Sequence, residues 1–286
     1  MHDLIVIGAG PAGLGAALQA IYYGLDVLVL ERKDVGGRLR YAREIRNFPG
    51  FMAVHSSGAA LVKKMRTQAQ GSGMRTVNAE CKLIDWQRSC FMVHTSGRVQ
   101  HGRSVIIATG VRPVPLAIPG AVEAEDRIHF YWTDIPGIRG KTVAVIGAGE
   151  VAFDQACSLA EHGAKVLILA RGITPRAFPG LVALARRKGV RIRFNAPVRS
   201  ITAASEGRVV LHTPGEQAKA DYVLAAIGSK PCLPSLTTVA KKQMDRRIYL
   251  AGDADAANHR QAAIAFGDGV QKAMRVYTML RNGKPC

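Results

Sequence analysis

Two glycine-rich turns in the chain have the spacing of phosphate-binding loops. Gly8, Gly10 and Gly13 follow one apolar run, and Gly147 and Gly149 follow another one 139 residues further on. Glycine permits a tight turn and lets the free N–H groups of the next helix approach a pyrophosphate. A single turn of this kind is often a plain connector, whereas two in the same setting indicate two dinucleotide sites.

The two copies differ in charge where a nucleotide is identified. Glu31, 23 residues after Gly8, would accept hydrogen bonds from ribose hydroxyls and repel a 2′-phosphate. The matching position of the second copy is Ala170, followed by Arg171 and then Arg176. Guanidinium groups bind a phosphate through paired hydrogen bonds. We therefore expect FAD or NAD at the first site and NADPH at the second, unless the two arginines are ordinary surface residues of a basic chain.

The elements that position these residues form a repeated strand–helix–strand unit. Residues 4–32 and 143–171 share the order of apolar strand, glycine turn, helix and second strand, which is typical of a right-handed crossover. Apolar strands at 105–110 and 222–228 would complete the two sheets. The pattern predicts an α/β fold with two Rossmann-like, ββα-inserted dinucleotide-binding domains.

Breaks rich in proline and glycine divide the chain near residues 112 and 232. The tail beyond the second break is too short to be a domain. Its strand at 248–254 and a helix beginning near Arg260 are expected to join the first sheet, which makes the first domain discontinuous.

Composition and charge limit the class of protein. The 286 residues are 48% hydrophobic, enough for buried cores. No uncharged apolar run reaches membrane-spanning length, and an apolar strand begins at Asp3, so we expect a cytoplasmic protein without a membrane span or signal peptide. The net charge of +18 favours acidic partners. Basic clusters at 38–46 and 186–193 lack the interleaved aromatic residues that stack on bases, so we expect no nucleic-acid partner.

The five cysteines are scattered, and none of them form a Cys-x-x-Cys pair or have zinc-ligand spacing. They are Cys81, Cys90, Cys157, Cys232 and Cys286. We therefore expect no disulfide framework and no metal site. The histidines show no metal-binding pair, and His259 is more readily a surface residue than a group near a cofactor.

Several short motifs, taken in order, resemble the low-molecular-weight thioredoxin reductase family of FAD/NADP(H) flavoproteins over nearly the whole chain. They lie at residues 8–13, 31, 36–39, 47–51, 108–110, 147–149, 251–253 and 260–262. The resemblance implies a FAD-binding domain at 1–112 and 233–286 and a NAD(P)H-binding domain at 113–232.

The resemblance also implies roles for individual residues. The FAD ligands would be Gly8, Gly10, Pro11, Ala12, Gly13, Glu31, Arg32, Gly37, Arg38, Leu39, Asn47, Thr109, Gly110, Gly252, Asp253, Arg260, Gln261 and Ala262. The NADPH ligands would be Gly147, Gly149, Glu150, Val151, Arg171, Arg176 and Gly228. Within the first set, Glu31 would bind the adenosine ribose and Asp253 the ribityl chain. Residues 260–262 would lie at the pyrimidine edge of the flavin, where a helix N-terminus favours the reduced anion.

Two departures from the family bear on chemistry. Arg38 stands where the family has glutamine, and it either lies near the flavin or points outward beside the other arginines of 38–46. The family's Cys-x-x-Cys-Asp is replaced by residues 130–134, with Phe130 and Thr133 in the two cysteine positions. Asp134 is retained, as a turn residue or in its old role as a proton donor. A dithiol–disulfide cycle is therefore not expected.

Residues 128–132 are instead similar to those of the thioredoxin-reductase-like ferredoxin/flavodoxin–NADP(H) reductases. Those enzymes usually carry a C-terminal extension that covers the flavin, whereas this chain ends at Cys286. The flavin face is then open or covered by Tyr131 or Trp132, unless that pair belongs to the core. Tyr131, Trp132 and Asp134 are the candidate catalytic residues.

The sequence thus predicts a FAD-dependent enzyme that passes electrons from NADPH to a separate acceptor, for which an acidic protein such as ferredoxin or flavodoxin fits the charge. A quinone or another small molecule is an alternative acceptor. A flavin-binding redox sensor or interaction subunit without turnover is the alternative from another class. A homodimer is compatible with the resemblance.

Overall fold

The computed structural model describes residues 1–51, 57–255 and 259–282. The chain forms two compact units. The first contains residues 1–40, 44–112 and 230–286, and the second contains residues 41–43 and 113–229. Short strands β8 (Val111–Pro113) and β17 (Ser229–Pro231), which form a two-stranded sheet, lie where the chain passes between the units.

The first unit is built on a five-stranded parallel sheet with the order β19-β7-β1-β2-β3. Its strands are β1 (Leu4–Ile7), β2 (Val27–Glu31), β3 (Arg75–Asn78), β7 (Val105–Ile107) and β19 (Ile248–Leu250). The strand β19 comes from the tail and pairs with β7, as the sequence predicted.

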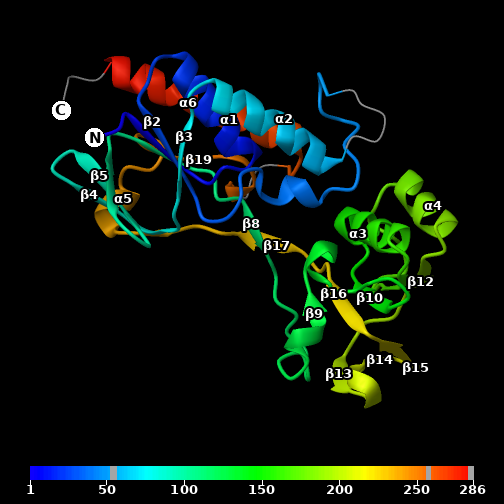
Figure 1. Ribbon diagram of the computed structural model, residues 1–286. Helices are drawn as coiled ribbons and strands as arrows, with labels where there is room; N and C mark the ends of the chain where they lie inside the picture. The colour runs from blue at the N-terminus through cyan, green and yellow to red at the C-terminus, as the bar shows by residue number, and fades with distance from the viewer. Residues whose placement is uncertain (52–56, 256–258, 283–286) are drawn as a thin grey trace. The chain divides into compact units, whose positions relative to one another are not determined.

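Helices cover one face of this sheet, and a second sheet, antiparallel except for its edge strand β18, covers the other. Figure 1 shows α1 (Pro11–Tyr22), α2 (Gly58–Gly71) and α6 (Ala262–Asn282) side by side. The four-stranded sheet on the face opposite the helices has the order β18-β4-β5-β6, and the short helix α5 packs against it. Its elements are β4 (Cys81–Gln87), β5 (Cys90–Thr95), β6 (Val99–Gly102), β18 (Ser235–Leu236) and α5 (Thr238–Lys241).

The alternation of side chains along β1 explains these three layers. Leu4 and Val6 pack with apolar residues of α1 and α6, whereas Ile5 and Ile7 pack with Phe91 and its neighbours in the antiparallel sheet. All four are at most 3% exposed. A parallel strand covered on both faces must be apolar throughout, which is why the run 4–7 contains no polar residue.

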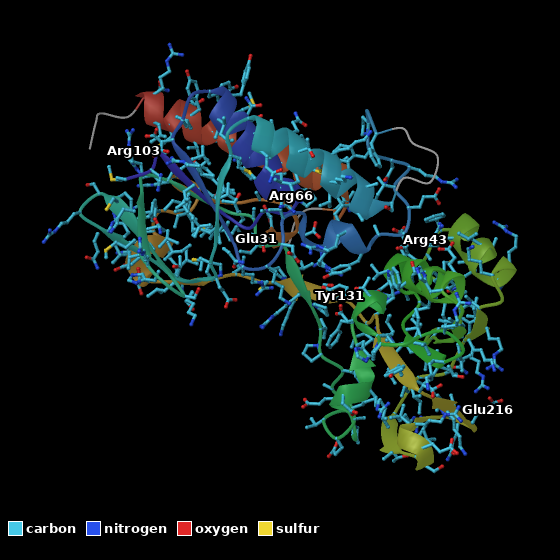
Figure 2. All side chains as sticks on the ribbon, in the orientation of Figure 1. Glu31, Arg43, Arg66, Arg103, Tyr131 and Glu216 are labelled. Carbon is cyan, nitrogen blue, oxygen red and sulfur yellow. The ribbon has the colours of Figure 1, made fainter. Side chains whose placement is uncertain are left out.

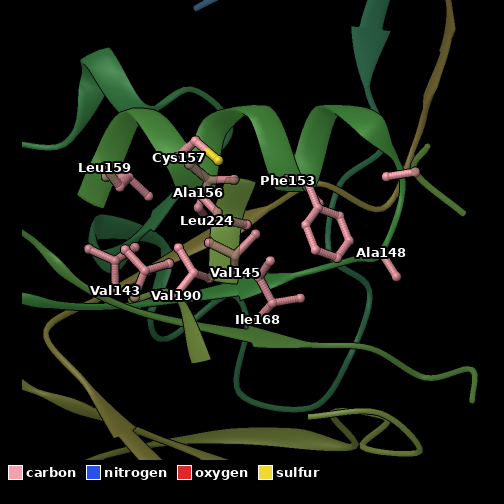
Figure 3. Close-up of a cluster of buried hydrophobic side chains, with 14 of the residues drawn as sticks. Val143, Val145, Ala148, Phe153, Ala156, Cys157, Leu159, Ile168, Val190 and Leu224 are labelled. Atoms are coloured by element: carbon pink, nitrogen blue, oxygen red, sulfur yellow. The ribbon is translucent and has the colours of Figure 1, made fainter. Parts of the chain in front are cut away.

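The second unit repeats this plan. Its parallel sheet has the order β12-β11-β10-β16-β9, and its antiparallel sheet has the order β13-β14-β15. The strands are β9 (Ile128–His129), β10 (Thr142–Ile146), β11 (Lys165–Leu169), β12 (Arg191–Arg193), β13 (Ser200–Ala203), β14 (Val209–Thr213), β15 (Glu216–Ala220) and β16 (Tyr222–Ala225). The helices are α3 (Glu150–Glu161) and α4 (Pro179–Arg187). Figure 3 shows Phe153, Ala156 and Cys157 of α3 packed over Val145 and Ile168 of the sheet.

The sequence repeat is confirmed, and its elements end earlier than the apolar runs suggest. The helices α1 and α3 each have 12 residues and begin 139 residues apart, at Pro11 and Glu150. The strand expected at 248–254 ends at Leu250, because Gly252 adopts a φ of 64° and the chain turns into a short 3-10 helix. The last helix begins at Ala262, two residues after the expected start.

Within the described part of the chain, no helix is both long enough and apolar enough to cross a membrane.

The contact between α1 and α6 allows a paired test of glycine packing. A Cβ added at Gly269 would lie 1.9 Å from the carbonyl oxygen of Ala12, whereas a Cβ added at Gly267 meets nothing within 4 Å. We expect Gly269→Ala to lower the free energy of unfolding by about 3 kcal/mol, because α6 must move away from α1. Gly267→Ala in the same helix should raise it by up to about 1 kcal/mol. Urea denaturation followed by circular dichroism measures both, and equal effects would contradict the packing.

Candidate functional site

The turn between β1 and α1 is too tight for side chains at two of its glycines. A Cβ at Gly8, where φ is 101°, would lie 2.5 Å from the carbonyl oxygen of Ala108, and one at Gly13 would lie 1.8 Å from the carbonyl oxygen of Gly8. A Cβ at Gly10 would meet nothing within 4 Å. Gly8 and Gly13 thus bring the helix against the sheet, and Gly10 leaves its N-terminus open to a ligand.

The first turn of α1 has the character of an anion site. The helix begins with Pro11 after the Gly10 cap, it has no side-chain cap, and its first turn contains no acidic residue. Its free N–H groups, including that of Ala12, therefore keep their capacity for an external acceptor.

Glu31 is fixed beside this turn at the end of β2 (Figure 2). Its Oε2 accepts a hydrogen bond from the backbone N–H of Ala9 at 2.8 Å, and its Oε1 accepts one from that of Lys33 at 2.9 Å. Each carboxylate oxygen has a second lone pair for a hydroxyl donor. A surface cavity of about 470 Å³ adjoins this strand end and is lined by Arg32, Lys33, Asn78, Glu80, Lys82 and Ser96.

The segment that follows β2 contains a second pair of glycines, Gly36 and Gly37, which lie against the phosphate turn. The backbone N–H of Gly36 donates to the carbonyl of Ala9 at 2.7 Å, and a Cβ at Gly37 would lie 3.3 Å from the Cα of Gly10. The short 3-10 helix Gly37–Tyr41, which contains Arg38 and Leu39, thus begins on the phosphate turn.

Further along this segment, Asn47 Nδ2 donates to Gln261 Oε1 at 3.0 Å. This bond joins two of the predicted flavin ligands that lie 214 residues apart, one before α2 and one just before α6.

Thr109 and Gly110 lie in the segment after β7, where one buried hydroxyl forms no hydrogen bond within the described residues. The Oγ1 of Thr109 is buried without a hydrogen-bond partner, and its Cα lies 3.1 Å from where a Gly8 Cβ would stand. A buried hydroxyl without a partner is costly in an isolated protein. Together with the open N-terminus of α1, it fits a polar group that binds at this turn.

Asp253 comes to the same place from the tail. A Cβ at Gly252 would lie 2.7 Å from Ala12 Cβ, and the backbone N–H of Gly252 donates to Asp268 Oδ2 at 2.8 Å. Burial raises the pKa of the Asp253 carboxyl, and the charges of Arg260 and Arg38 oppose that shift. The sequence analysis did not identify Asp268 as a candidate. The feature that could have shown it is an acidic residue among the apolar and glycine residues of the last helix.

The turn between β10 and α3 in the second unit has the same construction. A Cβ at Gly147, where φ is 140°, would lie 2.4 Å from the carbonyl oxygen of Ala226, whereas Gly149 and Gly228 face open space. Helix α3 has no side-chain cap. Glu150 and Val151, the other predicted ligands here, are exposed on its first turn.

Two arginines flank this second turn. Arg171 and Arg176 are exposed, and neither has an ion-pair partner among the described residues. The backbone N–H of Arg176 donates to the carbonyl of Ala148 at 2.8 Å, which ties the loop after β11 to the glycine turn. The charge at this strand end is therefore positive, opposite to that of Glu31 in the first unit.

The segment 130–134, where a dithiol is absent, is held by a residue that the sequence did not identify as functional. Gln155 of α3 is 3% exposed. Its Oε1 accepts from the backbone N–H of Trp132 at 2.9 Å, and its Nε2 donates to the carbonyl of Phe130 at 3.2 Å. The detectable signal was a polar residue on an otherwise apolar helix face.

The three candidate catalytic residues lie in different surroundings within the second unit. The ring of Trp132 packs on the core and lies 4.4 Å from the ring of His162. Tyr131 stacks on Tyr41, with ring centres 4.2 Å apart. Asp134 is exposed and accepts a hydrogen bond from Thr133 Oγ1 at 3.2 Å. The structure therefore does not bring these side chains together as one cluster.

The cysteines of the described residues are free thiols that form no close pair. Cys81 and Cys90 lie in the β4–β5 hairpin, Cys157 lies in the core of the second unit, and Cys286 is outside the described residues. Burial raises the pKa of Cys81 to about 12 and that of Cys157 to about 11. No cluster of His, Cys, Asp and Glu among the described residues could hold a metal ion.

Comparison with known proteins identifies the class that this fold and these turns define. The family model for pyridine nucleotide-disulphide oxidoreductases matches residues 2–283, and the chain belongs to this family. It is a flavin- and NAD(P)H-dependent oxidoreductase of the thioredoxin reductase-like group, with two dinucleotide-binding domains. The predicted fold class and family resemblance are thereby confirmed.

Three comparisons illustrate the relationship. The chain is 30% identical to a 34.2 kDa protein in the rubredoxin operon of Clostridium pasteurianum, over 96% of this chain and 91% of that one. It is 29% identical to the ferredoxin–NADP reductase of Ignicoccus hospitalis, over 99% of both. Its fold matches the thioredoxin reductase of Lactococcus lactis with a TM-score of 0.86 and 24% identity, over 99% of this chain and all of that one.

The raised thiol pKa values predict slow alkylation of two cysteines. A thiol reacts as its thiolate, and a pKa of about 11 leaves roughly one thiol in a thousand ionised at about pH 8. We expect Cys157 and Cys81 to resist iodoacetamide in the folded protein and to react after denaturation, as peptide mass spectrometry would measure. Modification of either one at the rate of a free cysteine would contradict their burial.

Proposed function

We propose that this protein is an NADPH-dependent FAD enzyme that passes electrons to a separate acidic acceptor protein and uses no redox-active dithiol. The observation that carries the proposal is the segment 130–133. It contains no sulfur, and buried Gln155 holds its backbone through two hydrogen bonds.

The residues of the first unit suit FAD. The N-terminus of α1 at Gly10 would bind the pyrophosphate, and Glu31 would accept the ribose hydroxyls. The segments that contain Leu39, Asn47 and residues 260–262 would hold the isoalloxazine ring, and Asp253 would bind the ribityl chain. When bound, FAD supplies hydride acceptance from NADPH and electron transfer to the acceptor.

The residues of the second unit suit NADPH. The N-terminus of α3 would bind the pyrophosphate, and Arg171 and Arg176 would bind the 2′-phosphate with donors that no carboxylate of the described chain occupies. Trp132 packs against the core, whereas Tyr131 stacks on Tyr41, so we propose the Tyr41–Tyr131 pair rather than Trp132 as the aromatic group nearest to a bound ligand.

The charge of the chain supports an acidic acceptor. A net charge of +18 raises the encounter rate with an acidic protein at low salt. The relative from Ignicoccus hospitalis is named a ferredoxin–NADP reductase. The relative from Clostridium pasteurianum is named as a protein in the rubredoxin operon. Both names point to small electron-carrier proteins as the acceptor class.

The central test compares acceptors and removes the thiols. A variant with all five cysteines changed to alanine should retain NADPH-driven reduction of an acidic ferredoxin within about twofold, because no step needs a thiol. High salt should lower kcat/KM for ferredoxin about tenfold and leave that for an uncharged dye nearly unchanged. Loss of activity with the cysteines, or reduction of thioredoxin in preference to ferredoxin, would contradict the proposal. A protein that binds FAD but transfers no electrons would favour a sensor.

The nucleotide preference is tested separately. Arg171→Ala with Arg176→Ala should raise the KM for NADPH about 30-fold or more and leave the KM for NADH nearly unchanged, because each guanidinium contributes about 1–3 kcal/mol of charged hydrogen bonding. The control is Arg199→Ala, which removes an exposed arginine elsewhere in the second unit and should change neither value. Steady-state kinetics measures both, and an equal loss with NADH would place these arginines outside the 2′-phosphate site.

A further inference from the structure

Helix α2 has a cationic face without a carboxylate partner. Lys63, Lys64 and Arg66 are exposed on it (Arg66 is labelled in Figure 2), and the helix contains no acidic residue. Every Asp and Glu of the chain lies within the described residues, and none of them forms an ion pair with these three side chains. We call Lys63, Lys64 and Arg66 the α2 cations.

The stability of the helix does not explain the α2 cations. Cations stabilise a helix in its last turn, but the last turn of α2 contains none, and the three lie near its middle. Lys63 and Arg66 are three positions apart on the helix, a spacing at which like charges repel each other. Lys64 also lies over Phe51, with its Nζ 5.3 Å from the ring centre. Folding thus gains little from the charges of Lys63 and Arg66, which favours a role in binding a partner.

The buried face of α2 packs on the segment that is predicted to hold the flavin. A Cβ added at Gly36 would overlap the side chain of Val62, and Gly36 directly precedes the predicted flavin ligands 37–39. Phe51, under Lys64, comes just after the last predicted flavin ligand of the same segment. The α2 cations therefore lie on the helix beside the predicted flavin site, within one unit of the structure.

An acidic protein is the occupant that fits this surface. The first unit contains 24 lysine and arginine residues against 11 acidic residues, so it accounts for +13 of the net charge of +18. A second copy of this chain would bring the same cations against one another at a symmetric interface. A protein that takes electrons from the flavin must come close to it, and negative charge on that protein would be attracted to the α2 cations.

We propose that the α2 cations form the docking surface for the acidic electron-carrier protein that this enzyme reduces. The inference rests on the proposed function, because it takes the flavin to lie at the residues beside α2 and the acceptor to be acidic. Carboxylates of the carrier would lie against Lys63 and Arg66 and would raise the rate of productive encounter. Docking adds no chemical step to the transfer of electrons from the reduced flavin to the carrier.

The test compares two charge reversals of equal size at different places on the first unit. Lys63→Glu with Arg66→Glu changes the docking surface, and Lys242→Glu with Arg246→Glu is the matched control. Lys242 and Arg246 are exposed beside α5, which packs on the sheet opposite the helices, and neither forms an ion pair within the described residues. Each variant replaces one lysine and one arginine, so both change the net charge by the same amount.

The measured quantity is kcat/KM for an acidic ferredoxin with NADPH as the donor. At low salt, Lys63→Glu with Arg66→Glu should lower it about tenfold, and the control should lower it less than about twofold. The neutral pair Lys63→Gln with Arg66→Gln should give about a threefold loss. Near 1 M salt, where the Debye length is about 3 Å, the wild type and the α2 variants should agree within about twofold. Rates with an uncharged dye should stay unchanged in every variant, because no cofactor ligand is altered.

The outcomes separate this inference from the proposed function. An equal loss in both charge reversals, or no loss in either, overturns the docking surface while ferredoxin reduction by the wild type upholds the proposed function. If Lys63→Glu with Arg66→Glu loses binding to vesicles of anionic phospholipid and still reduces ferredoxin normally, the surface serves a membrane, and the proposal is wrong. A wild-type protein that takes up no FAD, or that reduces the dye but not ferredoxin, overturns the proposed function and with it this inference.

Discussion

The turn from β1 into α1 leaves no room for side chains at Gly8 and Gly13, and the first unit is organised around this turn. Between Gly8 and Gly13 the backbone approaches itself so closely that a single added carbon at Gly13 would overlap the carbonyl of Gly8. Because the helix is held that close, its N-terminus opens at the carboxyl ends of the strands. Glu31, Thr109 and Gly252 reach the same point from three other strand ends.

The same constraint acts again at Gly147, and the two units differ mainly in charge. A carboxylate held by backbone N–H groups stands at the end of β2, whereas two exposed arginines flank the end of β11. The shared backbone leaves an uncapped helix N-terminus twice. Under the proposed function, the side chains at the strand ends would bind a ribose in one unit and a phosphate in the other.

The segment 130–134 differs from a dithiol segment in its packing as well as in its lack of cysteines. Gln155 uses both ends of its amide to hold residues 130–132, and the ring of Trp132 packs against the core. The segment thus has a defined conformation of its own. Under the proposed function, such an enzyme would depend on its bound cofactors for redox chemistry and on its charge for meeting an acceptor.

The sequence by itself determined the repeated α/β plan, the two glycine turns and the charge difference between Glu31 and Arg171. These features follow from local rules, because strand, turn and helix each depend on residues within a few positions of one another. The sequence did not determine where the apolar runs stop being strands, since a positive φ at Gly252 ends β19 early. Nor did it determine that Trp132 packs against the core, that Gln155 holds its backbone, or that Asn47 bonds to Gln261. Only the tertiary structure decided these points, because each depends on partners brought together from distant parts of the chain by the packing of backbone on backbone.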